Sequence, residues 1–417
     1  MQPDSAPSIT AAPRGAAAIH VDALRGLAAL VVLAYHVRYK FFLDYAEVGA
    51  ADLMTRVFYV ATSFGHDAVM VFFVLSGYLI TGTVIRDIRA GRWSWRRYLA
   101  NRLTRLYVVL IPGLLLTTGW DLLGLSLYPV HPAYTGATQV WAHDFFDVRA
   151  SLSLPIFWAN LAFRQAVAGV PPLGSNSALW SLTYEFAYYL LFPLALLAVW
   201  RSTRLAPRLF CLLATLLLGA YFGPRILLFS LVWLMGLAVR VLPPLAARSP
   251  MATRLRNVAV VLGAIGLTAA RHTSAFQGLA GSAALEAGDF VVGAAFGGAL
   301  YVLLSDARPT TGSAYARLAQ ASAAVSYTLY VVHMPLLIFL RAALNPGPQW
   351  RVSAGSVVAA LALCVGLVAY AALAWFAFES RTTTVRDWVA RALKVSDPPR
   401  PGAPAQGSRH AVGSAVY

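Results

Sequence analysis

The chain has 417 residues, of which 59% are hydrophobic and only 12% are charged. Soluble domains carry about 25% charged residues, so the composition excludes an ordinary soluble protein and indicates a polytopic membrane protein. The net charge of +16 does not indicate a nucleic-acid partner, because the positive residues gather in loops on one side of the expected membrane.

A helix needs roughly 17–25 largely apolar residues to cross a bilayer. The sequence has ten candidate segments and predicts an all-α integral membrane protein of about ten transmembrane helices. The seventh segment is short, so a tilted path, a re-entrant path or a misplaced boundary is open for it. The ten segments lie at 20–39, 64–84, 104–123, 178–200, 208–223, 225–242, 257–270, 289–305, 324–344 and 355–378.

The loops alternate between arginine-rich and arginine-poor along the chain. By the positive-inside rule, both termini are expected in the cytoplasm and the protein in the cell inner (plasma) membrane. Residues 1–19 are then a cytoplasmic segment, 20–380 the transmembrane domain, and 381–417 a cytoplasmic tail that is disordered from about 397. The long connector at about 124–177 is expected outside, packed on the outer mouth by its aromatic residues Trp141, Phe145, Phe146, Phe157 and Trp158.

The first segment, HVDALRGLAALVVLAYHVRYKFF from His20, carries Arg25 and His36 within an apolar stretch. A charge at the bilayer centre costs about 2.5–3.5 kcal/mol, so such groups usually serve a purpose. Eleven residues make three helical turns plus about 20°, which puts both side chains on one face about 16 Å apart. This arrangement fits a ligand that enters from one side and reacts further in, with His36 as a general base. An ion pair that locks two helices is the alternative.

The second and third segments add a serine and a basic pair. Ser76 and Gly77, in VMVFFVLSGYLIT, favour close helix packing; a nucleophilic Ser76 is an alternative, although no glycine-flanked serine motif surrounds it. Arg102 and Arg105, in RRYLANRLTRL, share a helical face at the cytoplasmic entrance. They either anchor the helix to anionic lipids or bind the phosphates of a nucleotide-bearing donor.

Glu185, in the fourth segment, is expected at a depth similar to that of His36 and either orients a catalytic imidazole or forms a structural ion pair. His333 is followed by Pro335, which frees a backbone carbonyl one turn earlier. His333 therefore either satisfies exposed backbone or belongs to the site. Glu379, at the cytoplasmic end of the last segment, is expected to be reached by water. The two cysteines, Cys211 and Cys364, form no metal pattern, and neither a metal nor a bound cofactor is expected.

Five stretches in this order resemble the membrane-bound acyltransferase-3 family. They are DALRGLAALVVLAYH at 22–36, FFVLSGYLIT at 72–81, RRYLANRLTRLY at 96–107, LWSLTYEFAYYLLFP at 179–193 and SYTLYVVHMPLL at 326–337. Each alone is a weak signal, but the ordered set is specific and covers residues 20–380. In this resemblance Arg25 and His36 match the paired first-helix residues of the family, and Arg102 and Arg105 match its basic pair. Many members carry two adjacent glutamates in the fourth segment, where this chain has Glu185 and Phe186.

The resemblance implies a ten-helix enzyme that moves an acyl group, most often acetyl, from cytoplasmic acyl-CoA to a hydroxyl. The implied acceptors are cell-envelope polysaccharides or glycolipids, or else small molecules such as macrolide-type hydroxyls. Acyl-CoA would act as a co-substrate, with its phosphates on Arg25, Arg102 and Arg105 and its thioester near His36. His36 would serve as general base or transient acyl carrier, and Glu185 would hold the imidazole or bind the acceptor. A proton-coupled transporter or flippase and a non-catalytic membrane partner are the rival classes.

Overall fold

The computed structural model describes residues 16–136, 147–200, 204–245, 249–271, 281–305 and 313–394. Within these ranges the regular secondary structure is helical, and a single bridge between Phe42 and Trp350 is the one strand-like pairing. The prediction of an all-α protein is thus confirmed. Residues 1–15, the expected aromatic residues of the loop at 137–146, and the tail from 397 lie outside the described residues.

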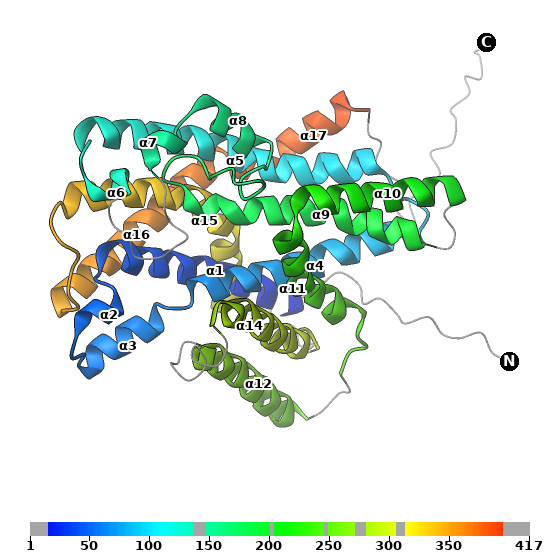
Figure 1. Ribbon diagram of the computed structural model, residues 1–417. Helices are drawn as coiled ribbons and strands as arrows, with labels where there is room; N and C mark the ends of the chain where they lie inside the picture. The colour runs from blue at the N-terminus through cyan, green and yellow to red at the C-terminus, as the bar shows by residue number, and fades with distance from the viewer. Residues whose placement is uncertain are drawn as a thin grey trace, which may run out of the picture.

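Among the described residues, ten long helices form a bundle, and shorter ones lie around it (Figure 1). The long helices are α1 (Ala16–Phe41), α4 (Gly65–Arg89), α5 (Trp95–Leu127), α9 (Trp180–Val199), α10 (Leu205–Phe222), α11 (Pro224–Val241), α12 (Pro250–Arg271), α14 (Gly281–Leu304), α15 (Ala314–Leu344) and α16 (Ala354–Ala377). The shorter elements are α2 (Tyr45–Val48), α3 (Leu53–Ala61), α6 (Pro132–Thr135), α7 (Val148–Ser151), α8 (Leu154–Leu161), α17 (Thr382–Ala392) and the 3-10 turns Ser177–Leu179 and Glu379–Arg381.

Helices α1 and α15 run parallel along their full lengths. Near their starts, the His20 ring lies 2.9 Å from the Tyr315 hydroxyl, and near their ends, the Arg341 side chain donates to the Lys40 carbonyl at 3.0 Å. We call the end of the bundle where α1, α5 and α15 begin the basic end, because Arg86, Arg89, Arg96 and Arg97 gather there. The opposite end, where α6 and α7 lie, is called the loop end (Figure 1).

The path of the chain shows that the short seventh segment crosses the bundle. Within the described residues, nine stretches are long and apolar enough to cross a membrane, and α12, which contains the seventh segment, is not among them. Helix α11 nevertheless ends at the basic end, where the Tyr301 hydroxyl near the end of α14 donates to Pro243 O at 2.5 Å. Because α11 and α14 both run toward the basic end, α12 must carry the chain back between them. Its 22 residues span about 33 Å, so the described chain traverses the bundle ten times.

Glycines bring α4 and α11 into backbone contact. A Cβ on Gly77 would lie 1.9 Å from the Trp233 carbonyl oxygen, and a Cβ on Gly236 would lie 2.1 Å from that of Val74. Neither position can hold a larger residue unless the helices move apart. The expected close packing at Gly77 is therefore present, as in other membrane bundles that use small residues at helix crossings.

The segment before α9 is buried inside the bundle at the loop end. The Asn176 amide donates to Thr117 Oγ1 at 3.0 Å and to the Val331 carbonyl at 2.9 Å. Asp121, which is fully buried, accepts from both the backbone N–H and the hydroxyl of Ser175 at 2.7 and 2.6 Å. Helix α9 consequently begins at the level of Val331 in α15, well below the end of the bundle.

Candidate active site

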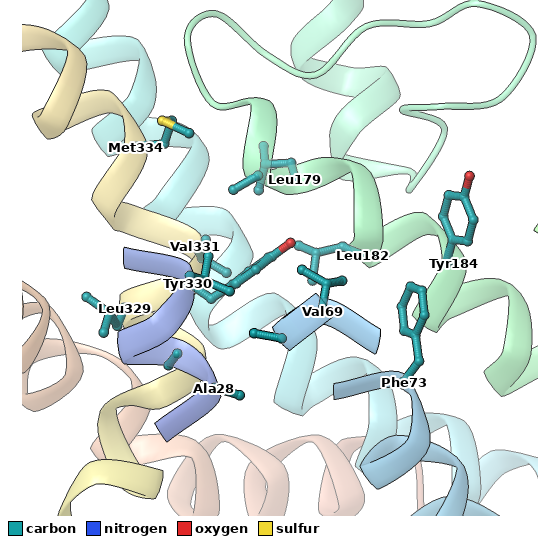
Figure 2. Close-up of a cluster of buried hydrophobic side chains, with 14 of the residues drawn as sticks. Ala28, Val69, Phe73, Leu179, Leu182, Tyr184, Leu329, Tyr330, Val331 and Met334 are labelled. Atoms are coloured by element: carbon teal, nitrogen blue, oxygen red, sulfur yellow. The ribbon is translucent and has the colours of Figure 1, made fainter. Parts of the chain in front are cut away.

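A cavity lies between α1, α4, α5, α9 and α15. Its volume is about 100 Å³, which is room for several water-sized groups because one water needs about 10–15 Å³. Figure 2 shows part of its apolar wall, where the Tyr330 ring extends from α15 toward Leu182 of α9, with Val69 and Phe73 of α4 nearby. The cavity brings together five of the predicted site residues: Arg25, Ser76, Arg102, Arg105 and Glu185.

Three arginines from two helices give the cavity a positive character. Arg25 comes from α1, and Arg102 and Arg105 come from the first turns of α5. Arg25 and Arg105 are electrostatic neighbours of each other, and both also interact with Glu185. Three guanidinium groups against one carboxylate on the cavity wall leave a net positive site, which favours an anionic ligand.

Arg102 has a donor that is free to bind a ligand. Its guanidinium lies over the rings of Tyr98 and Tyr189, at 5.7 and 5.8 Å from their centroids. Such ring contacts stabilise a cation at the face of an aromatic ring. The Nε atom of Arg102 is buried and makes no hydrogen bond with any described residue. A buried donor without a partner is costly, and a phosphate oxygen would satisfy it.

Glu185 lines this cavity and makes no hydrogen bond with His36 among the described residues. Its Oε1 accepts a hydrogen bond from the Tyr189 hydroxyl, one helical turn along α9. The expectation that Glu185 holds the His36 imidazole is therefore not met by the hydrogen bonds, because the partner of His36 is His333 at 2.9 Å.

Glu185 does not reach His36 because the start of α9 is buried inside the bundle. The Ser181 hydroxyl lies 2.7 Å from that of Tyr330, so these residues are level. Glu185 is four residues further along α9 toward the basic end, about 6 Å. His333 is three residues further along α15 toward the loop end, about 4.5 Å. The sequence-based estimate of depth took residue 178, where the predicted fourth segment begins, as the membrane surface. It therefore placed Glu185 about two helical turns, or about 10 Å, too close to the level of the histidine pair.

His36 and His333 form a stacked pair just beyond the cavity. Their ring planes are 24° apart with centroids at 5.0 Å, and His333 is buried at 1% exposure. Tyr330 links the pair to the cavity, because its hydroxyl meets Ser181 in the cavity wall and its ring lies 6.3 Å from that of His333. Sequence patterns single out both histidines separately, but the pairing depends on the parallel register of α1 and α15, which no local pattern reveals.

One of the two interpretations drawn from the sequence was that His333 satisfies an exposed backbone carbonyl. His333 does bond a backbone carbonyl, but this is not the carbonyl that Pro335 frees. Its Nδ1 lies 2.8 Å from the Leu329 carbonyl. The carbonyl four residues before Pro335 is that of Val331, and Asn176 occupies it. The backbone defect is thus repaired from the loop segment, which leaves the second ring nitrogen of His333 for His36.

Ser76 lines the cavity but lacks the surroundings of a nucleophile. Its hydroxyl accepts a hydrogen bond from the indole N–H of Trp233 at 3.2 Å. The hydrogen bonds of the described residues give it neither a histidine nor a carboxylate as partner. The same residues contain no cluster of three or more His, Cys, Asp or Glu side chains that could hold a metal ion.

Glu379 is a site residue that the sequence pattern placed in water. The structure shows it partly buried, accepting a hydrogen bond from the Thr328 hydroxyl of α15. It interacts electrostatically with Arg105 and Arg25. Its position at the end of a span made it look exposed, yet the 3-10 turn Glu379–Arg381 folds it back against the bundle. A carboxylate within two residues of a span end, opposite a basic cluster, is the signal that would have found it.

Comparison with known proteins defines the class. A family model described as an acyltransferase domain, acyltransferase 3, matches residues 19–376. This polytopic all-α protein, with an arginine-lined cavity and an adjacent histidine pair, therefore belongs to the acyltransferase-3 family. The family expected from the five sequence stretches is confirmed. No solved structure matches the chain.

Three relatives share part of the sequence. An O-acetyl transferase of Shigella phage Sf6 is 28% identical over 51% of this chain and 56% of its own length. Acyltransferase MdmB of Streptomyces mycarofaciens is 30% identical over 41% of this chain and 37% of its own. An uncharacterized protein of Haemophilus influenzae is 27% identical over 38% of this chain and 63% of its own. The chain thus covers less than two thirds of each of these relatives.

Proposed function

We propose that this protein is a membrane O-acyltransferase that moves an acyl group, most often acetyl, from cytoplasmic acyl-CoA to a hydroxyl of a cell-envelope carbohydrate or glycolipid. The observation that carries the proposal is the juxtaposition of the arginine-lined cavity with the His36–His333 pair, linked by Tyr330. One part provides cations for an anionic donor, and the other provides a base for a hydroxyl. The names of the Sf6 and Streptomyces relatives support acyl transfer as the reaction class.

The charge of the cavity suits acyl-CoA, because its phosphates are anionic and its acyl end is not. Guanidinium groups bind phosphate oxygens through charge-assisted hydrogen bonds. Arg102 and Arg105 lie in the first three turns of α5, near the basic end, where a cytoplasmic ligand would enter in the proposed orientation. Arg25 lies eleven residues before His36 on α1, about 16 Å along the helix, so a donor held by its phosphates must extend its thioester toward the loop end to reach His36.

In the proposed reaction, His36 takes the proton of the acceptor hydroxyl, and the oxygen attacks the thioester carbonyl. A carbon–oxygen bond forms, the carbon–sulfur bond breaks, and the departing thiolate takes the proton from His36. A transient acyl group on His36 is the alternative path for the same net reaction. Glu185 and Glu379 orient the arginines in this account, through their electrostatic interactions with Arg25 and Arg105.

The acceptor class rests on the comparison and is the finer part of the proposal. The phage relative is named an O-acetyl transferase, and the Streptomyces relative an acyltransferase; a small-molecule or macrolide-type hydroxyl is the second candidate. Mass spectrometry of envelope glycans and small glycosides from cells with and without the gene distinguishes them. A mass increase of one acyl group in a glycan fraction supports the first candidate, and the same increase confined to small glycosides supports the second. No acyl-dependent difference in either fraction contradicts the proposal.

A further inference from the structure

The hydrogen bonds of the histidine pair form a chain that ends on the backbone. His333 Nδ1 lies 2.8 Å from the Leu329 carbonyl oxygen, and His333 Nε2 lies 2.9 Å from His36 Nδ1. A carbonyl oxygen only accepts hydrogen bonds. The proton between His333 and Leu329 therefore belongs to the His333 ring, which fixes the direction of the chain at this end.

The remaining protons follow from the first one. A neutral imidazole carries a single N–H, and its second nitrogen is an acceptor. With Nδ1 of His333 protonated, its Nε2 must accept, so the proton in the second hydrogen bond belongs to His36 Nδ1. The Nε2 atom of His36 is then left with a lone pair. Among the described residues, neither ring has a hydrogen bond to a carboxylate that would hold an additional proton on the pair.

We infer that His333 is a positioning residue, which holds His36 in the tautomer protonated on Nδ1 and so makes Nε2 the nitrogen that takes the acceptor proton. Orientation of a catalytic imidazole usually falls to a carboxylate. Here a second imidazole, itself fixed by the Leu329 carbonyl, has that task. The tautomer stands on the hydrogen bonds alone, whereas the role of Nε2 in catalysis rests on the proposed function.

Proton balance is kept throughout the cycle. When His36 Nε2 takes the hydroxyl proton, the imidazolium keeps its Nδ1–H bond to His333, which strengthens because the donor is now charged. The proton on Nε2 then passes to the departing thiolate, and His36 returns to the starting tautomer. His333 keeps its proton on Nδ1 at every step and donates it to the Leu329 carbonyl oxygen.

The test is magic-angle-spinning NMR of the purified, bilayer-reconstituted protein labelled with ¹⁵N-histidine, because the two tautomers give distinct nitrogen signals. A His36→Gln spectrum assigns the His36 signals among the eight histidines of the chain. We expect His36 protonated on Nδ1 and bare on Nε2. His333→Leu should yield a mixture of tautomers, and His333→Gln should keep the single tautomer, because its amide can accept from His36 and donate to Leu329. His66→Gln, in α4, is the control that should leave the His36 signals unchanged.

His36 protonated on Nε2 in the wild-type protein, or a His36 pattern unchanged by His333→Leu, would overturn the inference. Turnover of the same variants then separates it from the proposed function. We expect His333→Leu to lower kcat by about 10²- to 10⁴-fold, the range for a lost or misoriented base, with little change in the donor KM, and His333→Gln to recover most of it. Should the tautomers behave as stated while the wild-type protein transfers no acyl group, the proposed function fails and the positioning of His36 by His333 stands; full acyl transfer by His36→Ala would remove only the role of His36 as base.

Discussion

The charged side chains of the site are arginines that line the cavity and carboxylates that interact with two of these arginines. Arg25, Arg102 and Arg105 line the cavity, and the interactions of Glu185 and Glu379 are with Arg25 and Arg105. This division gives each group a different expected effect on the binding of the donor and on the chemical step.

Removal of a cation should weaken donor binding more than it slows the reaction. For Arg102→Ala and Arg105→Ala we expect the KM for acyl-CoA to rise about 10- to 100-fold, because a hydrogen bond to a charged group contributes about 1.5–3 kcal/mol. The value of kcat should change less. Initial-rate measurements over a range of acyl-CoA concentrations give both quantities. Arg89→Ala, an exposed arginine at the end of α4, is the control; a donor KM that stays constant in both cavity variants would leave only lipid anchoring for these residues.

Glu379→Gln should impair the enzyme, contrary to what a water-exposed carboxylate at this position would predict. The substitution keeps an acceptor for the Thr328 hydroxyl but removes the negative charge that interacts with Arg25 and Arg105. We expect turnover at subsaturating acyl-CoA to fall about three- to tenfold, equivalent to about 0.7–1.4 kcal/mol. Asp387→Asn is the matched control, because Asp387 is exposed and its ion pair is with the adjacent Arg386. Equal activity of Glu379→Gln and the control would show that the charge of Glu379 does not contribute to the site.

For individual residues of the site, the sequence identified the types of residue but not their partners. Arg25, Arg102 and Arg105 could be grouped because an arginine in or beside an apolar span is costly and therefore informative. The partner of His36 could not be found in this way. Glu185 was chosen because a carboxylate commonly orients an imidazole, while His333 lies 297 residues away and pairs through the register of two parallel helices.

At the scale of helices, the crossing of α4 and α11 is the most sensitive packing contact near the site. Gly77→Ala places a Cβ 1.9 Å from the Trp233 carbonyl, so the helices must separate, at a cost of about 1–3 kcal/mol for overpacking. We expect a lower midpoint temperature of unfolding in detergent. Gly119→Ala in α5 is the control, because a Cβ added there would have nothing within 4 Å. Equal midpoint temperatures for the two variants would show that α4 and α11 can move apart at no cost in stability.

The sequence misplaced the depth of α9, and the cause is burial of the start of this helix among other elements. Helix α9 begins inside the bundle because Asn176 and Ser175 bond to residues of α5 and α15, so apolarity alone set its depth wrongly. Helix α12 (Pro250–Arg271), by contrast, was recognised from the sequence as the short seventh segment, and the directions of α11 and α14 require it to cross. Hydropathy detects segments that face lipid, and it cannot report on contacts that satisfy polar groups within the protein.

At the scale of the whole molecule, ten traversals place the start of α1 and the end of α16 at the same end of the bundle. The proposed orientation puts this basic end in the cytoplasm. In a background with Cys211 and Cys364 replaced by alanine, we expect Ala50→Cys to react with a membrane-impermeant maleimide in intact cells and Ala90→Cys to react only after lysis. Both positions are exposed, in the α2–α3 and α4–α5 connections respectively. The reverse pattern would invert the orientation and remove the cytoplasmic route for acyl-CoA.

The most direct test of the account is transfer of radiolabelled acetyl from acetyl-CoA by the purified protein to an envelope extract of the producing cells. We expect label in the acceptor fraction with the wild-type protein and with His20→Ala, a histidine on the same helix that bonds Tyr315 at the basic end. His36→Ala should reduce the rate by about 10²- to 10⁴-fold while yielding the same amount of folded protein. Transfer by His36→Ala at more than about a tenth of the wild-type rate, outside the range expected for loss of a general base, would contradict the central role of the histidine pair.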